Sequence, residues 1–454
     1  MIFSFIRYTQ PVWKFNLLPV APKFAACLYH PIILPLSEDI DIQPDERYQT
    51  EAAQNADIAY RAWNKGCLIE ATEQQAMQIK SLGKPSLKDE YIFIKKYWGL
   101  PWVLFALLLR IFTFKNIFKE LTAFFSSAGI KRINPYSHPV AVNGYKEFSS
   151  KLILSNPLVA VIIPTLNRYE YLQDVLDDLQ KQTYKNFEVL VYDQSDDFDK
   201  LFYEQFSLNL KVHIQKEKLL WTARNNAVKA TDAEHLLFFD DDSRVQPNWI
   251  AEHLKCLDFF KADISAGVSL AAIGGKVPES YNYFRWADQF DSGNALVKRS
   301  VFESIGLFDE QFNGMRMGDG EFGLRAYMHG FKSISNYKAT RVHLKVSTGG
   351  LRELGSWDGF RPIKWVAPKP IPSVVYLYKK YFPKSLKNNA ILIGVILSNI
   401  PYKYKRSNRL LAVSIVLSVI KSPLLFIQYY RSCIIAEKML NNPGSAIEIL
   451  HKKS

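Results

Sequence analysis

Continuous apolar runs and short polar segments alternate between residues 158 and 260. Leu158 to Ile163 is an apolar, β-branched run that ends at Pro164. Such a run is typical of a strand that is buried on both faces. Similar runs at 187–192 and 235–239 end directly before Asp193 and Asp240, and a shorter strand is expected at 211–214. The pattern therefore predicts buried strands with polar residues at their carboxyl ends.

Helix-type spacing separates these predicted strands. An apolar stripe follows the first strand and consists of Leu172, Val175, Leu176 and Leu179. Residues 221–230 are predicted to form another helix, and Pro247 and Asn248 open a third. Strands that alternate with helices indicate an α/β domain with an open, largely parallel sheet covered on both faces. Ligands bind such sheets at the carboxyl ends of the strands, where the polar residues fall.

The rest of the chain is expected to form two other regions, because 454 residues exceed one ordinary core. Residues 1–150 are predicted to be a mixed accessory region with a helix over 51–79 and a linker near Pro135 and Pro139. Residues 151–350 would form the catalytic domain. Residues 351–454 would form a basic, apolar, helical region.

The charge of the chain is concentrated in that last region. Residues 351–454 hold 17 Lys and Arg against 4 Asp and Glu, a net charge of +13 that equals the net charge of the whole chain. Basic clusters alternate there with apolar runs at 390–395, 410–420 and 424–427. This pattern favours contact with an anionic membrane surface over binding of nucleic acid. No run reaches the ~18–20 apolar residues of a spanning helix, and burial of these runs in a domain core is the alternative.

The sequence also suggests a compartment. The cysteines are single and form no CxxC pair, which is typical of a reducing environment. The first residues lack the charged start, long apolar stretch and cleavage site of a signal peptide. We therefore expect a cytoplasmic protein that lies peripherally on the inner face of the plasma membrane.

Three adjacent aspartates follow the strand predicted at 235–239, in Phe238-Phe-Asp-Asp-Asp-Ser243. Neighbouring carboxylates repel one another unless a cation offsets their charge. On an extended chain Asp240 and Asp242 face one side and Asp241 the other. Hard oxygen ligands suit Mn²⁺ or Mg²⁺, which also bind substrate phosphates. The triplet predicts a divalent-metal site, with a solvated acidic turn as the alternative.

Two later segments add candidate chemistry. Asp319 and Glu321 stand among glycines in Gly318-Asp-Gly-Glu-Phe-Gly-Leu-Arg325, where the backbone can approach a ligand closely. These acids could supply a general base or orient a hydroxyl. His343 is a candidate third metal ligand, since a carboxylate pair needs further ligands. An ordinary loop and a structural histidine are the respective alternatives.

Together these motifs resemble those of family 2 glycosyltransferases. The matching pieces are Ile163-Pro-Thr-Leu-Asn-Arg168, Val191-Tyr-Asp193, Thr222-Ala-Arg-Asn225, Phe239-Asp-Asp-Asp242, Ser292-Gly-Asn294 and the segment from Gly318 to Arg325. The resemblance implies the GT-A fold, a Rossmann-like mixed and mostly parallel sheet with helices on both faces. The spacing from Asp319 to His343 more narrowly resembles that of galactofuranosyltransferases that lengthen bacterial glycans.

The resemblance implies a role for each matching residue. The nucleotide site would comprise Pro164, Thr165, Arg168, Asp193, Arg224 and Asp241, with Asp193 bonded to a uracil or thymine ring. The metal ligands would be Asp240, Asp242 and His343, and the catalytic base would be Asp319. The acceptor or sugar would contact Glu321, Asn294 and Trp286, although Trp286 could equally be a core aromatic. Many relatives have two acids at the catalytic motif, and Gly318 replaces the first of them here.

The predicted function is an inverting transfer of a sugar to a hydroxyl of a glycan or lipid-linked acceptor in bacterial cell-surface polysaccharide synthesis. The donor would be a UDP-sugar or a dTDP-sugar. A metal-dependent nucleotidyltransferase is one alternative, but it would want a glycine-rich phosphate loop, and residues 163–168 contain no glycine. A degenerate carbohydrate-binding or scaffolding module is the other, and the intact set of candidate acids and His343 argues against it.

Overall fold

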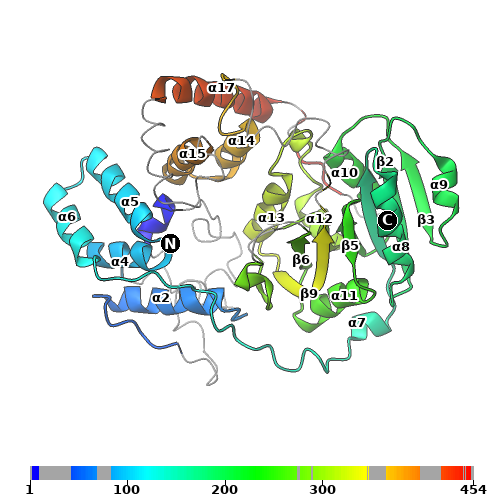
Figure 1. Cartoon of the computed structure of the whole chain (residues 1–454), viewed down its shortest axis with the longest axis horizontal. Helices are drawn as coiled ribbons and strands as arrows, with labels where there is room; N and C mark the ends of the chain where they lie inside the picture. The colour runs from blue at the N-terminus through cyan, green and yellow to red at the C-terminus, as the bar shows by residue number, and fades with distance from the viewer. Residues whose placement is uncertain are drawn as a thin grey trace. The chain divides into compact units, whose positions relative to one another are not determined.

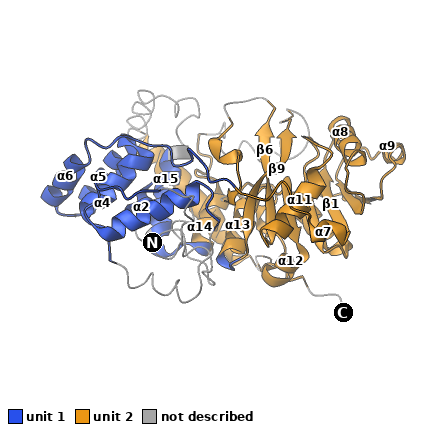
Figure 2. Cartoon of the chain, turned by 90° about the horizontal axis from the view of Figure 1, so that it is seen from below, with its two compact units in different colours: residues 1–141, 328–330, 381–397 blue, residues 142–327, 331–380, 398–454 orange. Residues whose placement is uncertain are grey.

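The computed structural model describes residues 3–9, 42–68, 83–272, 277–287, 290–344, 346, 365–398, 421–442, 444 and 446–450. The chain forms two compact units, coloured separately in Figure 2. Unit 1 comprises residues 1–141, 328–330 and 381–397, and unit 2 comprises residues 142–327, 331–380 and 398–454. The C-terminal quarter, predicted to be a separate region, contributes to both units.

Unit 2 contains one mixed sheet of nine strands in the described residues (Figure 1). The strands are β1 (Val159–Thr165), β2 (Phe187–Asp193), β3 (Leu210–Ile214), β4 (His235–Phe239), β5 (Ser243–Val245), β6 (Ile264–Ala271), β7 (Arg285–Trp286), β8 (Asn294–Lys298) and β9 (Ser333–His343). Their order is β3-β2-β1-β4-β8-β6-β9-β5, and β7 pairs with β9. The predicted fold class, an α/β fold with a mixed sheet and helices, is confirmed.

The first four strands lie where the hydrophobic pattern predicts them. They pair in parallel, and every residue of β1, β2 and β4 is buried. In the register of β1 and β2, Thr165 lies opposite Asp193. Strand β4 runs beside β1 in the same direction and ends one residue before Asp240. The polar residues after these strands therefore meet at one edge of the sheet.

Among the later strands, β5, β7 and β8 run against β1, whereas β6 and β9 run in the same direction as β1. The sequence pattern did not predict these strands. Strand β8 lies antiparallel between β4 and β6, while the long strand β9 runs parallel to β6 and antiparallel to β5. The β5–β9 register sets Ser243 opposite His343. This pairing carries His343, a hundred residues later in the chain, to the aspartates that precede β5.

Helices complete unit 2. They are α7 (Lys151–Leu154), α8 (Tyr169–Gln180), α9 (Lys200–Glu204), α10 (Leu220–Ala230), α11 (Trp249–Phe259), α12 (Arg299–Ile305), α13 (Gly318–Met328), α14 (Pro372–Tyr381) and α17 (Ser422–Asn441), with 3-10 turns at Glu279–Tyr281 and Glu310–Phe312. The predicted stripe of α8 is buried along its whole length. Of the helices in the described ranges, none combines the length and apolarity that a bilayer crossing requires.

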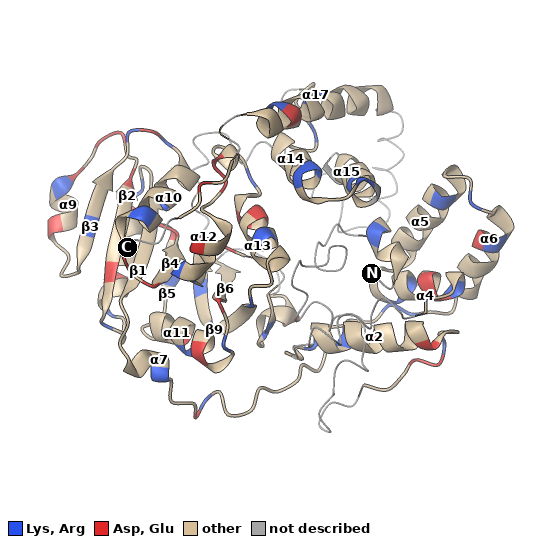
Figure 3. Ribbon diagram, turned by 180° about the vertical axis from the view of Figure 1, so that it is seen from behind, with Lys and Arg blue, Asp and Glu red and all other residues tan. Residues whose placement is uncertain are grey.

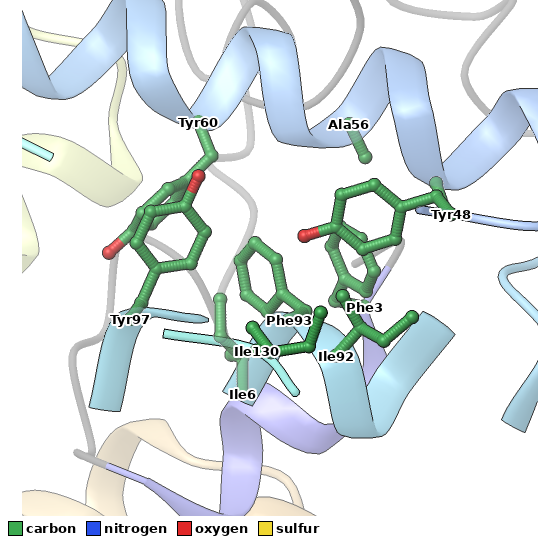
Figure 4. Close-up of a cluster of buried hydrophobic side chains, with 10 residues drawn as sticks. Phe3, Ile6, Tyr48, Ala56, Tyr60, Ile92, Phe93, Tyr97 and Ile130 are labelled. Atoms are coloured by element: carbon green, nitrogen blue, oxygen red, sulfur yellow. The ribbon is translucent and has the colours of Figure 1, made fainter. Parts of the chain in front are cut away.

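Unit 1 is helical. Its elements are η1 (Ser4–Tyr8), α2 (Glu51–Asn64), α4 (Leu87–Trp98), α5 (Leu100–Phe112), α6 (Ile117–Ser126) and α15 (Lys384–Ser398). An aromatic core joins η1, α2 and α4, in which the rings of Phe3 and Phe93 stack with centroids 3.8 Å apart (Figure 4). The helix predicted over 51–79 is confirmed as far as Asn64, residues 65–68 are not helical, and residues 69–79 lie outside the described residues.

A buried ion cluster lies beside this core. The ammonium of Lys96 on α4 contacts Asp57 on α2 at 2.8 Å and Asp45 at 2.6 Å. The hydroxyls of Tyr48 and Tyr97 donate to the same carboxylate of Asp57. Asp57 is fully buried and Lys96 nearly so. Each charge therefore depends on its partners, because water cannot replace them.

Arg61 on α2 also pairs with Asp57, at 2.8 Å. We expect Lys96→Met to lower the stability of unit 1 by about 1–3 kcal/mol, because the buried carboxylate of Asp57 keeps Arg61 but loses the ammonium of Lys96. Urea denaturation followed by far-UV circular dichroism measures the loss. The matched control is Lys95→Met, which removes a partly exposed lysine one position earlier on the same helix. Equal stability losses in the two variants would contradict the role given to the cluster.

Candidate active site

Two aspartates and one histidine converge after β4. One potential ligand atom from each of Asp240, Asp242 and His343 lies within 4.8 Å of the others. The Nε2 of His343 is 3.2 Å from Oδ1 of Asp242. Asp240 and His343 keep part of their side chains exposed. Two carboxylates and an imidazole form a donor set that Mn²⁺ and Mg²⁺ accept, so these side chains fit a divalent cation.

Asp241 faces the other way, as expected for the middle residue of an extended triplet. Its carboxylate accepts a hydrogen bond from Thr165 Oγ1 at 2.8 Å and one from Arg168 at 2.9 Å. Burial raises the pKa of Asp241 to about 6, against the lowering effect of Arg168. The aspartate thus ties the end of β1 to the segment after β4 and holds the guanidinium of Arg168 beside the site.

Two buried arginines hold Asp240 from both sides. Arg224 on α10 donates to Oδ1 at 2.9 Å, and Arg341 on β9 donates to Oδ2 at 2.7 Å. Burial would raise the pKa of Asp240, but the charges of Arg341 and Arg224 outweigh it and hold that pKa below its usual range. Arg341 also contacts Asp291 at 3.0 Å. Each carboxylate oxygen has a second lone pair, so Asp240 can still accept another partner.

Asp319 at the start of α13 belongs to the same hydrogen-bonded network. Its Oδ1 accepts from the backbone N–H of Ser292 at 2.9 Å and from the hydroxyl of Ser292. The carbonyl of Ser292 accepts in turn from Arg224 at 3.0 Å. Burial raises the pKa of Asp319, which makes it a stronger base than a solvated carboxylate. Ser292 engages Oδ1 and leaves Oδ2 for another partner.

These elements lie in a segment with known relatives. Residues 160–319 match the sequence model described as Glycosyl transferase family 2. That segment runs from β1 through the aspartate triplet to Asp319. Residues 160–319 therefore form a glycosyltransferase family 2 domain within the chain.

Curated relatives of the family 2 domain include two bacterial proteins. The O-antigen biosynthesis protein RfbC of Myxococcus xanthus is 26% identical over 262 residues, which are 48% of this chain and 20% of that protein. The PGL/p-HBAD biosynthesis glycosyltransferase of Mycobacterium bovis is 25% identical over 199 residues, which are 38% of this chain and 71% of that protein. The match therefore spans only one fifth of the first relative.

Two solved structures resemble the chain. A 1–349 fragment of TarS from S. aureus in complex with UDP-GlcNAc is 19% identical, with a TM-score of 0.44, and the match covers 62% of this chain and 80% of that one. A mannosyltransferase from Pyrobaculum calidifontis, in complex with GDP-Man and Mn²⁺, is 17% identical, with a TM-score of 0.41 and coverage of 66% and 92%. The narrower resemblance to galactofuranosyltransferases stays a prediction.

Most of the predicted nucleotide-binding residues of the family 2 domain are buried. Pro164, Thr165, Asp193, Arg224 and Asp241 have little exposed surface, whereas Arg168 is partly exposed. The carboxylate of Asp193 accepts from the hydroxyls of Tyr169 and Tyr203, at 2.6 and 2.7 Å, and from the backbone N–H of Ser195. Sequence reasoning missed both tyrosines, because nothing in their spacing marks them as partners of Asp193.

The three residues predicted to contact acceptor or sugar are all buried. Glu321 is fully buried and forms an ion pair with Arg325, which also donates to the carbonyls of residues 305–307. Asn294 is fully buried, and its side chain bonds Trp249, His253 and the carbonyls of residues 268 and 339. Trp286 lies buried on β7. Such burial favours a structural role for these side chains, including the core-aromatic alternative for Trp286, and their contact with acceptor or sugar stays a prediction.

Arg341 and Asp291 were not predicted, although the structure gives them central positions. Arg341 connects Asp240 with Asp291 and also donates to Ser269 and Ser243. A signal for Arg341 did exist, because it stands two residues before His343 on one strand and shares its face. Asp291 directly precedes the quoted Ser292-Gly-Asn294 motif, but its charge had no assigned partner in the sequence.

The glycine at position 318, where many relatives have the first acid of the catalytic motif, has a steric explanation. A Cβ atom at this position would lie 2.2 Å from Cζ2 of Trp221. The Trp221 indole is buried, donates to the carbonyl of Phe312 at 3.1 Å and lies under the guanidinium of Arg224. The indole therefore occupies the space that the first acid of the motif would need. Gly293 is equally constrained, since a Cβ there would lie 2.1 Å from Oδ2 of Asp240.

We expect Gly318→Ala to destabilise the protein by about 1–3 kcal/mol through overpacking against the indole. In a Trp221→Phe background the same change should cost much less, because the clashing ring atoms are gone. A double-mutant cycle by thermal denaturation measures this coupling. Gly129→Ala is the control, since no atom lies within 4 Å of a Cβ at that position. Strictly additive effects would refute the steric explanation.

Proposed function

We propose that the protein is an inverting glycosyltransferase. It would transfer a sugar from a UDP-sugar, or from a dTDP-sugar, to a hydroxyl of a glycan or lipid-linked acceptor in bacterial cell-surface polysaccharide synthesis. The observation that carries this proposal is the convergence of Asp240, Asp242 and His343, with Asp319 joined to the same network through Ser292 and Arg224. A degenerate binding module would have no need of this arrangement.

The first part of the mechanism is neutralisation of the donor diphosphate. A divalent ion held by Asp240, Asp242 and His343 would supply positive charge to the leaving diphosphate. Arg168 and Arg224 add two fixed positive charges at the same edge of the sheet, each held by an aspartate of the triplet. Such groups stabilise developing negative charge without reorganising during the reaction.

Asp319 is the proposed general base. As the acceptor oxygen forms its bond to the anomeric carbon, the bond from that carbon to the phosphate oxygen breaks, and its electron pair leaves with the diphosphate. The proton of the acceptor hydroxyl passes to Asp319. The two bonds to Ser292 hold one oxygen of this carboxylate in place, which favours a single orientation of the base.

The nucleobase is proposed to bind near Asp193 at the end of β2, as the resemblance implies. Asp193 and Tyr169 form one hydrogen-bonded pair, and the tyrosine is partly exposed. Burial, together with the hydrogen bond to Asp193, raises the pKa of Tyr169 to about 12, so its hydroxyl remains a donor at neutral pH. A polar ring such as uracil or thymine suits this pair.

The acceptor is proposed to be presented at a membrane on the cytoplasmic side. Helix α17 supports the predicted contact of the C-terminal region, because Phe426, Tyr430 and Ile434 form an exposed apolar stripe beside the exposed Arg431. The predicted run at 390–395 lies in α15, where three of its six residues are buried and Leu392 is exposed. The run at 410–420 lies outside the described residues.

Asp319→Asn should abolish transfer while nearly preserving donor binding, because the amide keeps the shape of the side chain but cannot accept the proton. Turnover with a nucleotide-sugar panel and calorimetric donor titration measure the two effects. The control is Asp197→Asn, an exposed acid on the loop after β2. Unchanged turnover in Asp319→Asn would rule out the assigned role.

Asp242→Ala should remove the dependence of donor binding on Mn²⁺, since it deletes one of the three converging ligands. Calorimetry of nucleoside-diphosphate binding with and without Mn²⁺ measures this loss, and donor hydrolysis with Mn²⁺ checks that the purified protein is active. Donor affinity that still rises with Mn²⁺ in the variant would count against the metal site.

A further inference from the structure

Helices α5 and α6 of unit 1 form a hairpin with an apolar outer face. The inner face of α5 buries Val103, Ala106 and Leu107 in the core of the unit. The outer face is apolar too, and α5 is almost free of charged ribbon in Figure 3. Most surface helices turn a polar face to water. We define the hairpin surface as the exposed residues Leu100, Leu104, Leu108, Phe112, Phe114, Ile117, Phe118 and Phe125.

The largest of these side chains gather at the turn of the hairpin. Phe112 ends α5, Phe114 lies in the turn and Phe118 lies in the first turn of α6, and their exposed fractions are 75, 96 and 79%. Isolated exposed hydrophobic residues are common on proteins, but a contiguous group marks an interaction site. Three nearly uncovered phenylalanines at one protruding turn form such a group.

Phe114 occupies a backbone position that favours glycine. Its φ is +57°, and it follows the last residues of α5 with the bonds of a Schellman motif. The N–H of Phe114 bonds the carbonyl of Ile111, and the N–H of Lys115 bonds that of Arg110. A left-handed conformation costs a bulky residue about 1–2 kcal/mol relative to glycine. Because the ring of Phe114 is 96% exposed, burial within the protein does not offset this cost. The conformation therefore points to a partner outside the chain.

The charges near the hairpin surface are of one sign. Glu120 is the only acidic residue between positions 99 and 134, and it is buried against Arg110 and Tyr91. The exposed charges are basic, on Lys115 and Lys119 at the turn and on Lys131 beyond α6. A second copy of the chain would bring these like charges together across a symmetric interface. An anionic lipid surface instead satisfies both the apolar group and the lysines around it.

We propose that the hairpin surface inserts into an anionic lipid bilayer, with the three phenylalanines at the acyl boundary and Lys115 and Lys119 among the headgroups. The membrane contact proposed here is made by α5 and α6 and is separate from the one proposed for α17. It does not rest on the glycosyltransferase assignment, because vesicle binding is measured without any sugar donor.

Phe114→Gly is the sharpest test, because it removes the ring and relieves the backbone. The thermal midpoint of the full-length protein should stay equal or rise, while the affinity for phosphatidylcholine–phosphatidylglycerol vesicles falls roughly tenfold. Co-flotation with vesicles and differential scanning fluorimetry measure the two quantities. The matched control is Leu201→Ser on α9, which removes a 75% exposed apolar residue of unit 2 and should leave vesicle binding unchanged.

The contribution of charge is tested with Lys115→Gln and Lys119→Gln. Each change should lower the affinity for anionic vesicles about fivefold and hardly affect the affinity for phosphatidylcholine vesicles. Vesicle affinity that is the same in Phe114→Gly as in the unaltered chain would overturn the proposal. So would an equal loss in Leu201→Ser. A dimer that dissociates on Phe114→Gly, without vesicle binding by either form, would assign the surface to a second copy instead.

Discussion

The site depends on charge balance at one edge of the sheet. Asp240, Asp241, Asp242 and Asp291 lie among three arginines, and no aspartate of this group lacks a contact with Arg or His. Carboxylates at this density are tolerable only with nearby positive charge. The arginines supply that charge in fixed positions, and Arg168, Arg224 and Arg341 come from three different parts of the chain. The fold that brings these parts together is therefore also what balances the charge at this edge of the sheet.

Much of the first part of the sheet in unit 2 could be predicted from the sequence, because strands that are buried on both faces consist of unbroken apolar runs. Strands β1 to β4 and helices α8, α10 and α11 appear where periodicity placed them. Strands β5 to β9 were not predicted: β5 and β7 have only three and two residues, and β6 and β9 mix buried and exposed positions. Strand β8 is largely buried, but its five residues carry no distinct apolar run. The burial pattern of β9 mixes buried and exposed residues without a regular period. Its place is set by tertiary pairing with β6, which local sequence does not encode.

For the site, the sequence was informative where residue type and spacing carry the chemistry. The alternation of the aspartate triplet correctly separated Asp241 from its neighbours, and Asp240, Asp242 and His343 converge as expected. The sequence did not indicate which of the candidate residues would be buried. Glu321 and Asn294 sit in family motifs and read as ligands, yet each is enclosed by partners that only the folded chain supplies. Trp221 shows the same limit, because its proximity to Gly318 joins two helices nearly a hundred residues apart.

Asn294 shows what such an enclosed motif residue imposes on the chain. Its amide oxygen accepts from Trp249 and faces His253, and its amide nitrogen donates to two carbonyls on β6 and β9. Aspartate has the same outline but would turn an anion toward those two carbonyls, and leucine would leave several polar atoms without partners. Glutamine is too long for a space in which Gly267 already leaves no room for a methyl group. One side chain thus connects strands β6 and β9 with helix α11, and this packing by itself requires an asparagine at position 294.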